Sequence, residues 1–544
     1  MAALRTTVLV LLFATPWLTV AQSPTANAAR LMPGFGDVHH PVSTSNPEAQ
    51  KFFNQGLALS YGFNHEEAER SFRRAAELDP KLAMAWWGVA YVVGPNYNMP
   101  VDPEHEKTAY DAIQKAVTLS ANTPQIERDY IQALAKRYTN QANPDYHKLA
   151  VDYSNAMRDL SHKYPDDLDA ATIFAESAMN LRPWQLWNKD GSPAPGTEEI
   201  VSTLESVLRR DPTHLGANHF YIHAVEASSH PERALPSAER LAALAPASGH
   251  LVHMPGHIYI RTGDHAASEE TNVKAAAADE AYIKATGVQG VYPMMYYSHN
   301  LHFIAIENAN LGNYAASLAA AHKLADHVTP HIDEMPMLDF FASMTPMIMV
   351  RFRQWDQILQ QPAADPKHVV SAGIWHYARG LAYASKSQVK EAQAEIAELN
   401  KLAPEMGKIP TNSVSNANAE AIPVIAVHIV EARIALAQKK NADAIAHLKQ
   451  AVDLEDAMDY NEPPDWIAPV RETLGGMLLQ AGNPVAAEKV FRADLERHPR
   501  NPRSLFGLME SLKAQDRTVD AQWVERQFEA AWTNSDTKLR IEDL

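Results

Sequence analysis

The sequence contains no cysteine among its 544 residues. Disulfide bonds, thiolate metal ligands, cysteine-ligated iron–sulfur clusters and cysteine nucleophiles are therefore excluded. Without disulfides, the folded chain has to be held together by its core or by bound metal. Any metal ion would have to be bound by His, Asp, Glu, Tyr, Met or backbone groups.

Clustered basic residues are also missing. The chain has 48 Lys and Arg against 65 Asp and Glu, a formal net charge of −17, and shows no long basic block. Because phosphate contacts need clustered Lys and Arg, we expect no nucleic acid partner. The acidity by itself is typical of a solvated protein surface.

Long apolar runs are missing beyond the N-terminus. No later stretch reaches the roughly 18 apolar residues of a spanning helix, so we expect no stable membrane insertion after signal removal. Residues 1–21 have the pattern of a secretory signal peptide: Arg5 precedes a short apolar region, Val8–Ala14, and small residues end at Ala21 or Ala28, the two candidate cleavage sites. We predict export to the periplasm or the extracellular space, with an uncleaved anchor as the alternative.

Common catalytic motifs are absent as well. The segment from His219 to His223 lacks the glutamate that follows the first histidine in the helical zinc-protease signature. The sequence has no Gly-x-Ser-x-Gly elbow and no Gly-x-x-x-x-Gly-Lys phosphate loop. These absences leave no standard hydrolase or nucleotide-binding assignment.

Helical periodicity dominates what is present. From Ala49 to Pro80, apolar residues recur every three or four positions, and the proline ends the second helix of the pair. Small residues stand at fixed offsets in this segment and again near the C-terminus, with an aromatic residue at offset 16 in both. The matching sets are Gly56, Ala68, Phe72, Ala75 and Pro80, and Gly475, Ala487, Phe491 and Pro499. Such residues let two antiparallel helices approach closely while the aromatic side chain fills the space to the next pair.

These residues resemble the tetratricopeptide repeat (TPR) family. The resemblance implies an all-α, superhelical array of antiparallel helix hairpins (a TPR-like α-solenoid) of roughly eight to ten hairpins. Segments such as FNHEEAERSFRRAAELDP, HFYIHAVEAS and GHLVHMPGHIYIRTGD are also similar to a group of exported bacterial TPR proteins with no settled activity. We predict an extended leader over 22–45, N-terminal repeats over 46–165, central repeats over 166–330 and C-terminal repeats over 331–544.

Three segments interrupt the repeat pattern: Gly94–Pro100, Arg182–Gly196 and Tyr282–Ser298. Long loops within a compact array are often functional, so these loops are candidates to fold over the groove as lids. The candidate lid and groove residues are Tyr97, Asn98, Trp184, Trp187, Tyr292 and Tyr296. Tryptophans in such arrays also serve as core packing. A polar stretch over 406–422 marks a further boundary.

Histidines recur at equivalent places in the central repeats. His219 and His253 are 34 residues apart, as are His223 and His257, and 34 residues is the length of one TPR unit. Spacings of three, four and seven residues place each set on one face of its helix. The sets are His219, His223 and Glu226; His250, His253 and His257; and His299 and His302. The family resemblance implies that all eight side chains point into the concave groove.

Convergent imidazole and carboxylate groups indicate a metal site, and the ligand types leave Zn, Cu, Fe, Ni and Mn open. The candidates exceed what one tetrahedral ion takes, so one or two divalent ions fit, with hydrolytic or oxidative catalysis left open. Glu226 or Glu176 is the candidate general base, and Glu176 is a ligand candidate 43 residues before His219. The alternatives are a non-enzymatic scaffold that binds a peptide, protein or other organic ligand in the groove, and a structural polar network.

Overall fold

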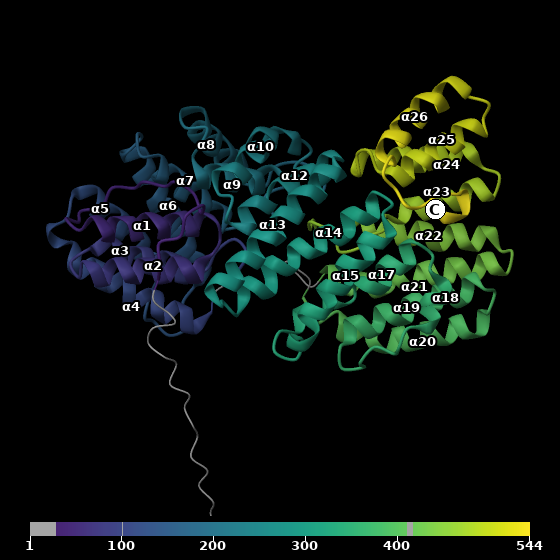
Figure 1. The fold of residues 1–544 in the computed structure, drawn as a ribbon, viewed down its shortest axis with the longest axis horizontal. Coiled ribbons are helices and arrows are strands. Elements are labelled where there is room, and N and C mark those ends of the chain that lie inside the picture. The colour runs from purple at the N-terminus through teal and green to yellow at the C-terminus, as the bar shows by residue number, and fades with distance from the viewer. Residues whose placement is uncertain (1–28, 101, 411–416) are drawn as a thin grey trace, which may run out of the picture.

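The computed structural model describes residues 29–100, 102–410 and 417–544. Within these ranges the regular secondary structure is helical, and the β-type pairing is limited to two isolated bridges. Successive helices pack as antiparallel hairpins, such as α1 with α2, α19 with α20 and α21 with α22 (Figure 1). The expected all-α array of helix hairpins is thus confirmed.

The N-terminal helices are α1 (Pro47–Tyr61), α2 (His65–Leu78), α3 (Ala83–Val93), α4 (Pro103–Leu119), α5 (Gln125–Ala135), α6 (Tyr146–Lys163), α7 (Leu168–Met179) and α8 (Thr197–Arg210). The central helices are α9 (Leu215–Val225), α10 (Leu235–Leu244), α11 (Gly249–His253), α12 (Pro255–Thr262), α13 (His265–Thr286), α14 (Ser298–Asn310) and α15 (Tyr314–Val328). The C-terminal helices are α16 (Asp339–Ala342), α17 (Met344–Arg351), α18 (Trp355–Gln360), α19 (Val369–Ser385), α20 (Val389–Met406), α21 (Ala417–Ala437), α22 (Asn441–Asp456), α23 (Val470–Gln480), α24 (Pro484–Arg497), α25 (Pro502–Lys513) and α26 (Thr518–Ala531).

The two aromatic residues that recur at offset 16, Phe72 and Phe491, each pack between two glycines of neighbouring hairpins. A Cβ at Gly56 would lie 2.8 Å from Phe72, and one at Gly88, in the next hairpin, would lie 2.4 Å from the same ring. Phe491 stands between Gly475 and Gly507 in the same way, at 2.4 and 2.2 Å. The aromatic residue therefore fills the space between repeats, and only glycine leaves room for it.

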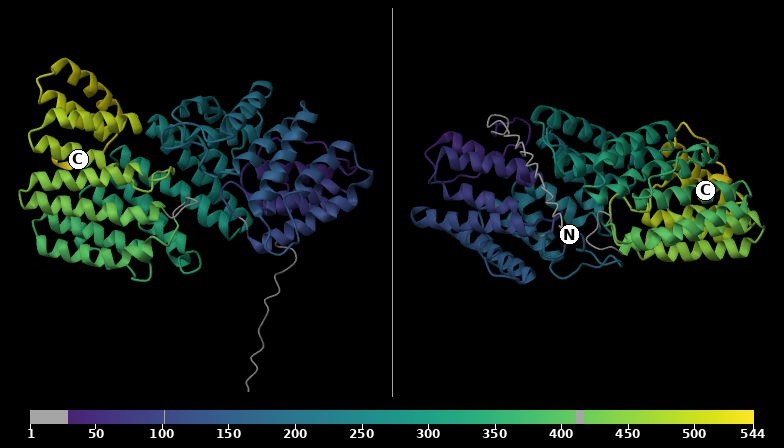
Figure 2. Two further views of the ribbon diagram at one scale, coloured as in Figure 1. Left: turned by 180° about the vertical axis from the view of Figure 1, so that it is seen from behind. Right: turned by 90° about the horizontal axis from the view of Figure 1, so that it is seen from below.

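Apolar side chains form two main cores that meet near α13. One core runs from Phe35 to Tyr292, and the other from Ala276 to Leu544. Figures 1 and 2 show the helices α1–α7 at one end of the molecule and α17–α26 at the other, with α9, α10 and α12–α15 between them. The predicted division of the chain at residues 165 and 330 stays a prediction, as does the signal peptide, which lies outside the described residues.

The interrupting segments differ in structure. Gly94 ends α3, and the 182–196 segment connects α7 to α8, both without helix as expected. The third segment was predicted to be a loop, but α13 continues to Thr286 and a π-helix covers Tyr292–Tyr297. Across residues 29–100, 102–410 and 417–544, no helix combines the length and apolar character needed to cross a bilayer.

Candidate metal centre

Four helices bring the predicted histidines together. His219 and His223 lie on α9, and Glu226 is the residue at its C-terminal cap. His250 and His253 lie on α11, His257 on α12, and His299 and His302 on α14. We expected His250, His253 and His257 on a single helix, but the helix is interrupted at Met254 because Pro255 lacks the N–H that would continue it.

The histidines separate into two groups that do not follow the helices. The first histidine group consists of His219, His223 and His250, and the second of His253, His257 and His299. Within each group, one ligand atom from every residue lies within 4.8 Å of the others. The two histidines of α11 are thus divided between the groups: the first group draws on α9 and α11, and the second on α11, α12 and α14.

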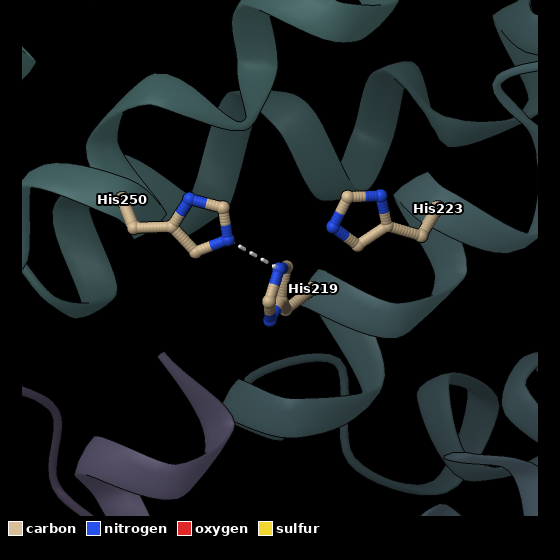
Figure 3. A group of neighbouring side chains, drawn as sticks. All are labelled: His219, His223 and His250. Atoms are coloured by element: carbon tan, nitrogen blue, oxygen red, sulfur yellow. Dashed lines mark hydrogen bonds between the residues drawn. The ribbon is translucent and has the colours of Figure 1, made fainter. Parts of the chain in front are cut away.

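In the first group, three imidazole rings face one another (Figure 3). His219 Nε2 lies 3.1 Å from His250 Nε2. His223 Nε2 is buried and has no hydrogen-bond partner among the described residues. Nitrogen ligands of a tetrahedral ion at about 2.0–2.1 Å are separated by about 3.3 Å, so the observed spacing is close to that of a ligand pair.

In the second group, His253 Nε2 lies only 2.8 Å from His257 Nε2. His299 completes the group, with its ring 4.8 Å from that of His253. The ring of Phe303 packs against all three, at 4.8, 5.4 and 5.1 Å between centroids. An apolar wall therefore lines this group on α14.

Two of the Nδ1 atoms that face away from the groups donate to acceptors on neighbouring helices. His219 Nδ1 donates to the backbone oxygen of Tyr61 at 2.6 Å, and His253 Nδ1 donates to Asn272 Oδ1 at 2.6 Å. The orientation of the Asn272 amide is set because its Nδ2 donates to Ser268 O at 2.7 Å. With a proton on Nδ1, a neutral ring presents an unprotonated Nε2, which is the form that binds metal.

Glu226 links the two groups. His223 Nδ1 donates to Glu226 Oε1 at 2.8 Å, and His257 Nδ1 lies 2.5 Å from Oε2 of the same carboxylate. One carboxylate therefore contacts one histidine of each group, on the Nδ1 side. This arrangement corresponds to the outer-sphere carboxylates that orient metal-bound histidines.

Burial and neighbouring charge decide the protonation of these residues. Burial lowers the pKa of His219, His250, His253 and His299 well below the ordinary value of 6.5, and the adjacent imidazoles lower it further. Burial by itself would raise the pKa of Glu226, but His257 and His223 bring it down to about 2. At neutral pH these four rings are neutral and the carboxylate is ionised.

The site is closed rather than open to a groove. We expected groove-lining side chains, but His219 and His253 are 0% exposed and Glu226 is 1% exposed. Aromatic rings cover the first group: Phe63 is 5.3 Å from His250, and Tyr97 is 5.3 Å from His223. Trp184 and Tyr296 add further contacts, at 5.5 Å from His223 and 4.8 Å from His250.

Phe63 occupies a strained backbone position. Its φ of 54° places it in the left-handed region, at a hairpin turn where Gly263 and Gly312 have φ of 75° and 79°. A non-glycine residue there costs about 1–2 kcal/mol. The ring is 2% exposed and stacks on His223 and His250, which offsets this strain.

The C-terminal repeats also reach this site. Tyr460, between α22 and α23, places its hydroxyl 3.5 Å from Glu226 Oε2. Arg261 packs 5.5 Å from the Tyr460 ring, and its Nε donates to Glu226 O at 3.1 Å. Residues more than 200 positions apart therefore enclose the same carboxylate.

Some predicted residues lie elsewhere. His302 belongs to neither group: its ring packs against Phe340 and Phe341 at 5.8 and 5.4 Å, and burial lowers its pKa to about 3. Glu176 is also outside both groups; it accepts from Asn180, and burial raises its pKa against the opposing effect of Arg137.

The lid candidates also divide. Tyr97, Trp184 and Tyr296 contact the histidines, and Asn98 Nδ2 donates to the Tyr296 hydroxyl at 3.4 Å. Trp187 instead donates to Ala224 O at 2.8 Å, and Tyr292 donates to Asp279 at 2.8 Å. These last two residues support neighbouring segments rather than the histidine rings.

Sequence reasoning missed Phe63, Asn272, Phe303 and Tyr460. Phe63 carried a usable signal, because an aromatic residue stands at a turn position where other repeats have glycine. Asn272 and Tyr460 have no such signal, because their contacts arise only from packing between separate hairpins.

Neither a protein-family model nor a curated protein matches the chain. Among solved structures, the chain is similar to a human IFIT1 dimer with m7Gppp-AAAA, at 14% identity, 90% coverage of this chain, 91% of that chain and a TM-score of 0.31. It is also similar to yeast Tom70, at 11% identity, 89% and 90% coverage and a TM-score of 0.30. The TPR domain of P58(IPK) matches at 11% identity, 86% and 99% coverage and a TM-score of 0.23. At these scores, the function of the chain has to be argued from its own residues.

Proposed function

We propose that this chain is an exported metal-binding protein in which each histidine group holds a transition-metal ion. The helix array on either side acts as the scaffold that positions the two groups. The support for export is the signal-like sequence of residues 1–21.

The contact between His253 and His257 carries the metal proposal. His253 Nδ1 donates to Asn272 and His257 Nδ1 lies 2.5 Å from Glu226 Oε2, so the two rings turn their Nε2 atoms toward each other. Two Nε2 lone pairs 2.8 Å apart would repel each other unless a cation, either a shared proton or a metal ion, lies between or beside them. A bound metal ion removes this repulsion and uses both nitrogens as ligands.

Metal analysis of the purified chain tests the proposal. We expect metal-free protein, dialysed against Mn, Fe, Ni, Cu or Zn, to take up at least one of them at two ions per chain. A His253→Ala/His257→Ala variant should retain only the ion of the first group. If the wild-type chain takes up none of these metals, the proposal is wrong.

A second candidate function is supported by an acidic cavity of about 560 Å³ beside α1, α5, α7 and α9. Its lining includes Asp37, Glu127, Asp166, Asp167, Asp169 and Asp211, together with His39, His40 and His214, of which the last two pair with Asp169. A cationic group, such as a peptide N-terminus or a lysine side chain, would complement this charge. Salt-dependent binding of a basic peptide, lost in an Asp166→Asn/Asp211→Asn variant, would support the scaffold function; equal binding by both proteins would refute it.

A further inference from the structure

The donor set of the two groups carries no charge. All six ligand candidates are imidazoles, and an imidazole binds a metal ion as the neutral ring. Glu226, the carboxylate nearest to both groups, faces the Nδ1 atoms of His223 and His257 and so lies on the outer side. Each ion would therefore meet three neutral nitrogens.

Burial makes the charge of the bound ion decisive. Five of the six histidines are at most 3% exposed, and phenyl, indole and phenol rings surround them. The cost of placing an ion in such surroundings rises with the square of its charge. Two divalent ions would bring four positive charges against the single negative charge of Glu226, whereas two monovalent ions bring two.

Repulsion between the ions acts in the same direction. The groups adjoin: the rings of His223 and His257 are 5.6 Å apart, and those of His250 and His253 are 5.9 Å apart. Coulomb repulsion scales with the product of the charges, so it is four times larger for two divalent ions than for two monovalent ions at equal separation. Closely spaced sites with neutral ligands thus favour singly charged metal.

The number of ligands points to the same choice. Each group supplies three histidines, and no fourth His, Asp or Glu among the described residues joins either group. Zinc would complete its tetrahedron here only by adding a ligand from outside the protein, such as water, and manganese prefers octahedral oxygen coordination. Copper(I) is the singly charged transition-metal ion that is stable with three nitrogen ligands, and imidazole is among the donors that suit copper.

We propose that the two histidine groups form a dinuclear copper(I) site, in which three imidazole nitrogens hold each ion and Glu226 orients one histidine of each group. This inference rests on the proposed metal-binding function and names its metal. It favours one-electron redox chemistry or copper storage over hydrolysis.

Anaerobic titration of the metal-free chain with copper(I), in competition with bicinchoninate, tests the proposal. We expect two equivalents to bind, a copper K-edge spectrum typical of three-coordinate copper(I), and no displacement by zinc in large excess. His219→Gln and His299→Gln should each reduce binding to one equivalent. Circular dichroism and thermal unfolding of the metal-free variants will show whether they fold.

Two control variants make the result specific. His302→Leu changes a buried histidine on the same helix as His299 and should keep two equivalents. His428→Ala removes a partly exposed cluster with Glu431 and His447, one of two further places where copper would add to the count; the other is His40 with Asp167 and Asp169. Two equivalents that persist in both controls, and also in a His40→Ala variant, belong to the central groups.

The outcomes separate this inference from the proposed function. If zinc displaces the copper, or if the edge spectrum shows copper(II) or four-coordinate metal, the copper(I) assignment is wrong and metal binding stands. If neither copper(I) nor any divalent ion binds, both proposals fail. Loss of copper in the His428→Ala variant alone would place the metal at the surface and overturn the inference.

Discussion

Replacing Glu226 with glutamine should weaken one histidine group and spare the other. The carboxylate accepts from His223 at 2.8 Å and lies 2.5 Å from Nδ1 of His257. Glutamine has nearly the same size but offers one oxygen acceptor and one NH₂ donor. The oxygen can serve only one of the two imidazoles.

The other imidazole would face the NH₂ donor. To avoid two opposing donors, its ring would move its proton to Nε2, and a protonated Nε2 cannot bind metal. Loss of an outer-sphere partner typically costs 10–100-fold in metal affinity, or about 1.4 to 2.8 kcal/mol. We therefore expect Glu226→Gln to bind one ion with near wild-type affinity and the other 10–100-fold more weakly.

Competition with a chromophoric chelator measures both affinities in one titration. Glu232→Gln is the matched control, because Glu232 contacts His230 at 3.1 Å but both side chains are more than half exposed. That variant should behave like wild type. Unchanged affinity at both sites in Glu226→Gln would refute the outer-sphere role, and equal loss of both ions would show that Glu226 is itself a shared ligand.

Three further predictions concern stability, each measured by urea unfolding of the metal-free chain. Phe63→Gly should destabilise it by about 2 kcal/mol, because relief of about 1–2 kcal/mol of left-handed strain does not offset the loss of a buried ring worth about 3–5 kcal/mol; a more stable variant would contradict this. Gly88→Ala should lower the free energy of unfolding by about 1–3 kcal/mol, because the added methyl group would collide with Phe72. The loss should be smaller in a Phe72→Leu background, and equal losses in both backgrounds would argue against the contact. The pKa of His302 falls from 6.5 to about 3 on folding, so its unfolded form binds the proton first and stability is lost as pH drops below 6.5. His302→Leu should therefore lose about 2 kcal/mol less than wild type between pH 8 and pH 5; parallel pH profiles would show that His302 is not buried in its neutral form.

Local sequence determined the repeats. Apolar residues at three and four residue intervals specify amphipathic helices, and this rule needs only neighbours in the same segment. The offsets of Gly56, Phe72 and their C-terminal counterparts also predicted close packing of the hairpins. The rings of Phe72 and Phe491 lie against glycines of neighbouring hairpins, as this prediction requires. The histidines of the central repeats were identifiable for the same reason, because repeat spacing translates into equivalent places on successive helices.

The membership of the site was decided by tertiary structure. Helical spacing placed His250 and His253 on one face, yet packing against α9 and α14 assigns them to different groups. His299 and His302 share a helix and are three residues apart, but Phe340 and Phe341 cover the second of them.

Glu226 acts on two groups, and Tyr460 reaches it, only because separate hairpins meet in space. Contacts of this kind depend on how hairpins stack and on the helix break at Pro255. The sequence by itself determined the helices and the histidine positions. The stacking of the hairpins decided which nitrogens face one another, because that depends on packing between residues that are distant in the chain.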